Sequence, residues 1–329
     1  MPNRIQISPD GPTFEALPHE TILRAAHRNG QSLPYECGWG SCGTCKVELL
    51  GGSVELIFKD APAITPRDAR RARILACQCR PTSDITISLP SGEWAGTPLP
   101  CHERIAELSA VEELAPEIRR FTFNVEGGAD FLPGQYAILH LPDDIRRCYS
   151  MCNLPDGKAL QFIAKRYQGG VGSNALSDLA PGSRITIEAP FGVCTLRRKA
   201  GRKVFVAGGT GVSPILSMIR QAAEEAVDFD APVDVIYGAR SPVDLAAGNE
   251  LAAAAARIPC ARYTPVVEVP PDGWAHLQGY VTNAITTLVD TPTQAEFYVA
   301  GPPVMVNSVK AHLKEAGVPI TQIHYDSFG

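Results

Sequence analysis

The sequence predicts a multidomain α+β protein in which a small sheet-and-helix domain precedes an antiparallel β-barrel and a doubly wound α/β domain. Strand-like runs surround one helical segment before residue 90, and short alternating strands recur from about residue 103 to 197. From residue 199 onward, strands, glycine-rich turns and helices alternate. With 329 residues and 45% hydrophobic content, the chain can bury two or three ordinary cores.

The first domain is expected to span residues 1–94. Strand-like runs and one helical segment follow each other there: residues 4–8, 21–29, 44–50 and 84–89. Residues 91–102 carry Gly, Pro and Ser without periodicity, which is typical of a connection between domains. We therefore place the first boundary in this short segment.

The second domain is expected at residues 101–197 and the third at residues 199–329. The second contains short strands separated by Gly, Pro and Asp turns: 104–111, 119–125, 136–141, 160–164 and 184–188. This pattern predicts an antiparallel barrel. The third alternates strands with helices: 203–207, 214–226, 233–237, 245–257, 296–300 and 304–316. Such alternation predicts a doubly wound α/β domain.

The most specific motif is a set of cysteines in the first domain. Cys37, Cys42 and Cys45 form a Cys-x4-Cys-x2-Cys motif, and Cys77 follows after 31 residues. This is the ligand spacing of a plant-type [2Fe-2S] ferredoxin. Structural zinc usually takes two Cys-x2-Cys pairs, which the chain lacks, and Cys79 could replace Cys77 as the fourth ligand. Three glycines would let the backbone fold closely over a cluster: Gly38, Gly40 and Gly43.

Composition argues against several classes of partner. A net charge of −5 is unfavourable for nucleic acid, because a phosphate backbone attracts basic surfaces. No apolar run is long enough to span a bilayer, and the N-terminus lacks a basic segment followed by an apolar one. We therefore expect a cytoplasmic protein with no membrane partner. The other six cysteines are scattered and are expected to be small buried thiols in a reducing compartment.

Two motifs in the second domain could bind a phosphorylated, flat cofactor. Arg147, Tyr149 and Ser150 combine a guanidinium for a diphosphate, a ring for a flat heterocycle and a hydroxyl for a ring nitrogen. Strand alternation puts Ser150 on the face opposite the other two. About twenty residues later, a glycine-rich segment precedes a helix expected from Ala175, whose free amides would face an anion. That segment contains Gly169, Gly170, Gly172 and Ser173. Taken alone, the two motifs also fit an ordinary strand and a plain glycine turn.

Two strand-to-helix turns in the third domain are candidates for nucleotide binding. The first contains Gly209, Thr210 and Gly211 and differs from the Gly-x-Gly-x-x-Gly fingerprint, although it permits close approach of a nucleotide. The helix after it has an apolar face: Ile215, Met218, Ile219, Ala222 and Ala226. The second turn contains Gly301 and Pro302 and would lie at the carboxyl edge of the same sheet.

Coenzyme choice depends on the residues after the strand that ends at Tyr237. Gly238 and Arg240 come first, and Asp244 lies four residues beyond Arg240. Arginine could accept a 2′-phosphate, whereas an acidic residue favours the free ribose hydroxyls of NADH, so these residues leave the coenzyme open. The terminal aromatic residue, Phe328, is typical of either a loose tail or a docked hydrophobic side chain.

The whole chain resembles the ferredoxin-NADP reductase superfamily, in the branch where a plant-type ferredoxin precedes the FAD and NAD domains. The first domain resembles the β-grasp fold of ferredoxins. Leu75-Ala76-Cys77-Gln78 is similar to the Leu-x-Cys-Gln segment of plant-type ferredoxins, which favours Cys77 over Cys79. Within the superfamily, the sequence is similar to reductase components of bacterial aromatic-ring dioxygenases and soluble monooxygenases.

The resemblance implies a role for each motif. Arg147 would bind the FAD diphosphate, Tyr149 would stack on the isoalloxazine or ribityl group, and Ser150 would hydrogen-bond flavin N5 as a catalytic residue. The Gly-Gly-x-x-Ser helix start matches Gly169, Gly170 and Ser173, with Gly172 in the same cofactor site. Phe328 would shield the flavin face until nicotinamide displaces it. The nicotinamide-nucleotide site would comprise Gly209, Thr210, Gly211, Gly238, Arg240, Gly301 and Pro302.

Two positions differ from the pattern of the family. Ala300 stands where many relatives have cysteine, so any role of that thiol must be absent or filled otherwise. Asp326 stands two residues before the terminal aromatic, where relatives often have glutamate. The segment from Tyr237 to Leu245 resembles NADH-using oxygenase reductases, which favours NADH as the coenzyme.

These motifs together predict an electron-transfer reductase that passes electrons from NADH through FAD and a [2Fe-2S] cluster to a ferredoxin or a terminal oxygenase. We expect it to act as a monomer. One alternative is a reductase that serves nucleotide-sugar deoxygenation. Another is a non-catalytic electron-transfer or redox-sensing subunit, which the complete pair of nucleotide turns disfavours.

Overall fold

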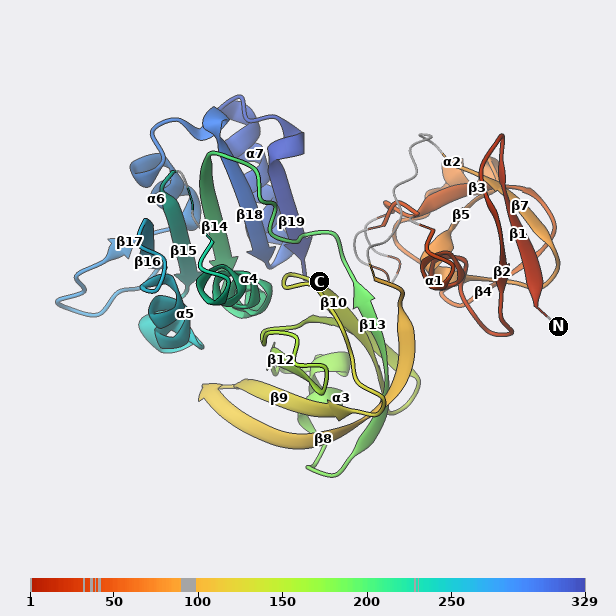
Figure 1. The fold of residues 1–329 in the computed structure, drawn as a ribbon, viewed down its shortest axis with the longest axis horizontal. Helices are drawn as coiled ribbons and strands as arrows, with labels where there is room; N and C mark the ends of the chain where they lie inside the picture. The colour runs from red at the N-terminus through yellow and green to blue at the C-terminus, as the bar shows by residue number, and fades with distance from the viewer. Residues whose placement is uncertain are drawn as a thin grey trace. The chain divides into compact units, whose positions relative to one another are not determined.

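The computed structural model describes residues 2–31, 33–35, 38, 40, 43–89, 99–227, 229 and 231–328. Two compact units divide the chain: Met1–Glu103 with Glu188–Phe191, and Arg104–Ile187 with Gly192–Gly329 (Figure 1). Most of the segment predicted to connect the first two domains lies outside the described residues. Among the helices that can be described, none has the length and apolar character needed to cross a bilayer.

The first unit is built on a five-stranded sheet with the order β2-β1-β7-β3-β5. β1 runs parallel to β7, and the other neighbours are antiparallel. The strands are β1 (Asn3–Ser8), β2 (Thr13–Ala16), β3 (Lys46–Gly51), β5 (Arg73–Leu75) and β7 (Ile85–Ser88). A separate two-stranded sheet pairs β4 (Val54–Leu56) with β6 (Cys79–Pro81). The strands predicted at residues 4–8, 44–50 and 84–89 are thus confirmed to within two residues.

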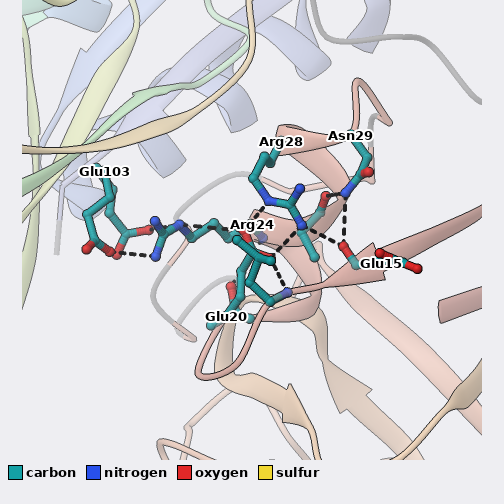
Figure 2. Close-up of polar contacts among 10 residues, drawn as sticks. Glu15, Glu20, Arg24, Arg28, Asn29 and Glu103 are labelled. Atoms are coloured by element: carbon teal, nitrogen blue, oxygen red, sulfur yellow. Dashed lines mark hydrogen bonds and ion pairs between the residues drawn. The ribbon is translucent and has the colours of Figure 1, made fainter. Parts of the chain in front are cut away.

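Helix α1 (Ile22–Arg28) confirms the helical segment predicted at residues 21–29. Thr21 caps it, since the Thr21 side chain accepts a hydrogen bond from the Arg24 amide at 3.2 Å. The helix buries its apolar side chains, and its two arginines bind residues of neighbouring segments (Figure 2). Arg24 pairs with Glu103 at 2.6 Å and Arg28 with Glu20 at 2.9 Å. The second helix of this unit, α2 (Pro66–Arg70), is shorter.

The second unit contains a six-stranded sheet with the order β11-β10-β13-β8-β9-β12. Its strands are β8 (His102–Ala115), β9 (Ile118–Val125), β10 (Tyr136–Leu141), β11 (Ile145–Ser150), β12 (Ala159–Lys165) and β13 (Arg184–Phe191). Met151, just after β11, bridges to Phe162 of β12, and the Cys152 amide donates to the Gln161 carbonyl at 2.9 Å. The two edges of the sheet therefore curl toward each other.

The same unit contains a six-stranded parallel sheet with the order β17-β16-β15-β14-β18-β19. Its strands are β14 (Arg202–Gly208), β15 (Val233–Ala239), β16 (Ala261–Val267), β17 (Leu277–Gln278), β18 (Ala295–Gly301) and β19 (Ile323–Ser327). From β14 the chain builds outward through β17 and then returns to add β18 on the other side of β14. The strand order therefore reverses between β14 and β18, which is where α/β sheets bind ligands.

Helices cover both faces of the parallel sheet (Figure 1). α4 (Val212–Glu224) and α5 (Gly248–Ala255) bury one face, and α6 (Val281–Leu288) and α7 (Pro303–Glu315) bury the other. Neighbouring residues of β14 alternate between these two cores, with Phe205 in one and Val206 in the other. The strands predicted at 203–207, 233–237 and 296–300 are confirmed, each slightly longer than expected.

Three helix predictions are wrong in detail. Ala226 does not belong to the apolar face of α4, because the helix ends at Glu224 and Ala226 is exposed with a φ of 47°. The helix expected from Leu245 begins only at Gly248, since residues Pro242–Asp244 form a 3-10 turn. The helix expected from Ala175, α3 (Val171–Ser177), begins four residues earlier, because Gly170 is extended and serves as its N-cap.

Candidate functional site

Two of the four predicted cluster ligands lie side by side in the first unit. The sulfurs of Cys45 and Cys77 are 3.3 Å apart, and both residues are buried. The Gln78 amide donates to the Cys77 sulfur at 3.6 Å. Cys79 lies two residues beyond Cys77, but its backbone belongs to the pairing of β6 with β4, and burial raises the pKa of its thiol to about 12. This arrangement fits Cys77, rather than Cys79, as the fourth cluster ligand.

The loop before Cys45 has the backbone conformation that only glycine adopts readily. Gly38, Gly40 and Gly43 have φ values of 69°, 103° and 78°. A Cβ on Gly40 would lie 3.0 Å from the Gln78 side chain, so the loop approaches the turn that carries Cys77. Cys37 and Cys42 lie outside the described residues, and the described side chains form no group of three or more metal ligands. The donors that can be described fit half of a four-thiolate site.

The structure brings the two predicted flavin motifs together. Arg147 lies on β11 and Gly172 on α3, and a Cβ on Gly172 would lie 2.7 Å from Arg147 Nε and closer still to its Cγ. Only glycine therefore leaves room for the Arg147 side chain against this helix. Ser173 closes the turn before α3, because its hydroxyl accepts from the Tyr167 amide at 3.1 Å. The guanidinium, the helix start and the turn thus form one cradle suited to a diphosphate.

Ser150 and Tyr149 lie at the end of β11. Ser150 is buried, and its hydroxyl donates to Asp326 Oδ2 on β19 at 2.7 Å. The Tyr149 ring lies 6.4 Å from the Phe162 ring, and burial raises the pKa of Tyr149 to about 12. Phe328 follows β19, and its amide donates to the Gly301 carbonyl at 3.0 Å. The C-terminal residues therefore dock on both the flavin motif and the second nucleotide turn, which excludes the loose tail.

A pocket of about 540 Å³ lies at the carboxyl ends of β14, β15 and β18, where the strand order reverses. Residues from both predicted turns and from the end of β15 line it: Gly209, Thr210, Gly238, Arg240 and Pro302. Gly211 and Gly301 lie beneath these turns. A Cβ on Gly211 would come within 2.7 Å of Gly301 Cα and closer still to the Ala300 carbonyl, so the two turns press directly on each other.

Two of the charged side chains that line the same pocket, Lys165 and Glu268, were missed from sequence. Lys165 on β12 lies 3.7 Å from Asp244, and the Ser241 hydroxyl donates to Asp244 at 2.7 Å. Glu268 also lines the pocket. Lys165 and Glu268 carry no local motif, because they reach the pocket only through the pairing of distant strands. Arg240 and Asp244 stood out, through their positions after the strand that was expected to end at Tyr237.

Comparison with protein-family models divides the chain into three consecutive matches. Residues 5–82 match a 2Fe-2S iron-sulfur cluster binding domain, residues 105–195 an oxidoreductase FAD-binding domain, and residues 205–311 an oxidoreductase NAD-binding domain. The first match contains all four predicted cluster ligands. The second contains the Arg147 motif, and the third contains both nucleotide turns.

Relatives and solved structures match over nearly the full chain. The ferredoxin–NAD(+) reductase component of the alkene monooxygenase system of Xanthobacter autotrophicus is 36% identical over 97% of this chain and 98% of that protein. The ferredoxin–NAD(P)(+) reductase CarAd of Metapseudomonas resinovorans is 32% identical over 94% of each chain. A solved structure of the ferredoxin reductase in carbazole 1,9a-dioxygenase has 30% identity and a TM-score of 0.86, covering 100% of this chain and 99% of that one.

Domains of the [2Fe-2S], FAD-binding and NAD-binding families thus follow one another along this chain. The chain has a ferredoxin reductase-type fold with [2Fe-2S], FAD and NAD domains. It therefore belongs to the family of ferredoxin–NAD(P)+ reductase components, oxidoreductases that move electrons from a nicotinamide nucleotide through FAD and an iron–sulfur cluster.

Proposed function

We propose that this protein oxidises NADH and delivers the electrons to a ferredoxin or to the terminal component of an oxygenase system. Bound FAD and a bound [2Fe-2S] cluster would together separate one hydride into two single electrons and a proton that is released to solvent. The finer architecture that we propose is a β-grasp ferredoxin domain at 1–94, an FAD-binding barrel at 101–197 and a doubly wound NAD domain at 199–329. The sheet orders and the curled antiparallel sheet support it.

The observation that carries the proposal is the hydrogen bond between Ser150 and Asp326 at 2.7 Å. Ser150 ends the flavin motif, and Asp326 lies on β19, directly beside Ala300 in the register of β18 and β19. The turn after β18 then lines the nucleotide pocket through Pro302. A flavin held by Arg147 and a nicotinamide entering at Pro302 would therefore meet at one edge of the parallel sheet.

In this site we assign each side chain a distinct task. Arg147 pairs with the FAD diphosphate beside α3, and Tyr149 packs against the flavin. Ser150 orients the flavin edge, and Phe328 covers it until nicotinamide enters. Gly211 and Gly301 let the nucleotide turns approach each other closely. The cluster ligands are assigned as Cys37, Cys42, Cys45 and Cys77.

We also propose NADH rather than NADPH as the electron donor. Asp244 and Glu268 both line the pocket, and a carboxylate repels a 2′-phosphate while accepting hydrogen bonds from ribose hydroxyls. Arg240 and Lys165 also line the pocket and bring positive charge to it. Lys165 lies 3.7 Å from Asp244, so part of that positive charge is already paired with a carboxylate. We expect a higher kcat/KM for NADH than for NADPH. The substitution Asp244→Ser should narrow that ratio.

The acceptor is proposed from the relatives. One belongs to an alkene monooxygenase system and one solved structure to carbazole 1,9a-dioxygenase, so an oxygenase or its ferredoxin is the partner that they support. Mixing the purified protein and NADH with candidate oxygenase components should restore substrate oxidation by one of them. A protein that oxidises NADH yet supports no oxygenase component would contradict this assignment.

Electron flow through the cluster is tested by the variant Cys42→Ser. We expect it to abolish NADH-driven reduction of cytochrome c and to spare reduction of ferricyanide, because ferricyanide can take electrons from the flavin directly. Cys260→Ser is the matched control, since the Cys260 thiol donates only a long hydrogen bond to the Phe229 carbonyl, at 3.9 Å, and both activities should persist. Equal loss of both activities in Cys42→Ser would contradict the proposed path.

A further inference from the structure

Helix α2 carries a concentration of positive charge that the fold itself does not use. Arg67, Arg70 and Arg71 are exposed, and none has an ion-pair partner among the residues that the structure describes. Arg67 and Arg70 lie three residues apart on α2, and Arg71 is the C-cap that follows them. Like charges at this spacing repel each other.

A buried acidic residue ties α2 to the rest of the first unit. Asp68 is buried, and its carboxylate accepts from Lys46 Nζ at 2.9 Å and forms a capping box with Thr65. These hydrogen bonds hold the pKa of Asp68 well below its usual range. The helix is therefore fixed with Asp68 inward and its three arginines outward. Several exposed arginines of the second unit do pair with carboxylates, as Arg257 does with Glu224 at 2.7 Å.

The segment that leads into α2 adjoins the loop that carries the cluster cysteines. A Cβ on Gly43 would lie 3.2 Å from the Lys46 side chain and 3.4 Å from Ala63, which precedes α2 by three residues. On the other side of the loop, a Cβ on Gly40 would lie 3.4 Å from the Phe58 ring. Phe58 is 38% exposed and Leu56 43% exposed. Apolar and basic side chains thus flank the loop.

We propose that Arg67, Arg70 and Arg71, with the exposed side chains of Leu56 and Phe58, form the docking surface for an electron-accepting protein that presents carboxylates. This inference rests on the proposed function, because the surface borders the point where electrons leave the cluster. An apolar centre with a charged rim is the usual anatomy of a transient protein interface. Opposite charge on the partner would steer its approach, even though this chain as a whole carries a net charge of −5.

The surface fits an acidic protein better than a nucleic acid. A phosphate backbone needs positive charge along an extended track. Here the three arginines are followed by Arg73, which already pairs with Asp68 at 3.4 Å, and exposed acidic residues lie on the neighbouring segment at Glu55 and Asp60. The positive region is therefore short and matches a few carboxylates.

The test uses the holoenzyme with FAD and cluster, and a triple variant in which Arg67, Arg70 and Arg71 are each replaced by Gln. The probe is the soluble domain of cytochrome b5, an acidic haem protein. Its reduction by the holoenzyme, with NADH as the electron donor, is measured at two ionic strengths, about 10 mM and about 300 mM. We expect the wild-type second-order rate constant to fall with salt. The triple variant should lose roughly tenfold at low salt and little at high salt, because screening already removes the steering.

A matched control replaces Arg4, Lys158 and Lys314, which are also exposed, by Gln and should keep the wild-type rate. Phe58→Gln should lower the rate at both ionic strengths, since an apolar contact is not screened by salt. Equal rate constants for wild type and the arginine variant at low salt would overturn the inference. A control variant whose rate constant falls as far as that of the arginine variant would overturn it too. The inference would also be overturned if the arginine variant lost binding to a DNA duplex of about 20 base pairs while it reduced cytochrome b5 at the wild-type rate.

The proposed function is monitored separately through NADH oxidation with a small neutral quinone, which needs no docking surface. Failure of that reaction in the wild-type holoenzyme would refute the proposed function. Salt-dependent binding of cytochrome b5 measured without NADH would then still decide the docking surface. Binding that the arginine variant loses would support it, and binding that the variant keeps would overturn it.

Discussion

Gly172→Ala tests whether the contact between Arg147 and α3 is part of the flavin site. A Cβ at residue 172 would lie 2.7 Å from Arg147 Nε and 3.0 Å from its Cδ. Unbonded carbon atoms normally lie about 3.5–4.0 Å apart, so the side chain must shift by about 1 Å or adopt another rotamer. Alanine is also the better helix former, by about 0.8–1 kcal/mol. Stability of the FAD-free protein should therefore change little while the guanidinium moves.

The expected effect is a weaker affinity for FAD. A hydrogen bond to a charged group contributes about 1.5–3 kcal/mol, and about 1.4 kcal/mol corresponds to a factor of ten in Kd. Displacing Arg147 should therefore raise the Kd for FAD about 10- to 100-fold, measured by fluorescence titration of FAD into the cofactor-free protein. Arg147→Ala should produce a similar loss.

Gly182→Ala is the control, because that position has a φ of 90° and an added Cβ would meet no atom of the described residues within 4 Å. It should cost about 1 kcal/mol of stability through backbone strain and leave FAD affinity unchanged. Wild-type affinity in Gly172→Ala would refute the reasoning. So would wild-type affinity in Arg147→Ala, since Arg147 would then have no part in holding FAD.

Three further outcomes follow from the same contacts. Gly211→Ala should raise the KM for NADH and lower the free energy of unfolding in urea by about 1–3 kcal/mol, because the added Cβ meets the backbone of β18. An unchanged KM would contradict the assignment of this pocket to NADH. Glu250→Ala should destabilise the second unit by about 1–3 kcal/mol, because Arg120, 2.5 Å from Glu250, and Arg220 both lose that partner; unchanged urea unfolding would count against it. Burial lowers the pKa of His27 to about 4, so the folded state binds fewer protons than the unfolded chain, and the stability present above pH 6.5 is lost as pH falls toward 4. The free energy of unfolding, measured with urea, should be lower at pH 5 than at pH 7.5 by on the order of 2 kcal/mol. The variant His27→Phe should show a smaller difference between the two pH values.

Much of the fold could be predicted from sequence because local patterns were strong. The strand-turn-helix order around β14 and β18 follows from buried strands next to glycine turns, and the pattern of apolar residues within 21–29 predicted α1. The error at α3 has a local cause, because Gly172 and Ser173 look like loop residues although the first turn of a helix tolerates both. Propensity alone could not reveal that Arg147 requires glycine at that place.

The parts that sequence could not supply depend on contacts between distant segments. Ser150 and Asp326 are 176 residues apart, and Arg120 and Glu250 are 130 apart. Neither pair has a spacing that any helix or strand period would reveal. The C-terminal strand β19 was also missed, because a short segment at a chain end gives the same weak signal whether it is a tail or an edge strand. Its pairing with β18 is what gives Asp326 a fixed place.

The bond between Ser150 and Asp326 constrains the role that Ser150 can have. A serine hydroxyl carries one hydrogen, so it cannot donate to Asp326 Oδ2 and to flavin N5 at once. In the proposed site the two acceptors would therefore compete for the single Ser150 hydrogen. Because β18 and β19 pair Ala300 with Asp326, this carboxylate stands beside the position where many relatives carry a cysteine. Ala300 is fully buried and brings no titratable group, so of these two paired residues only Asp326 can exchange a proton with Ser150. Aspartate has a shorter side chain than glutamate, yet the Asp326 carboxylate lies 2.7 Å from the Ser150 hydroxyl. The pairing of β19 with β18, and not a long side chain, brings it there.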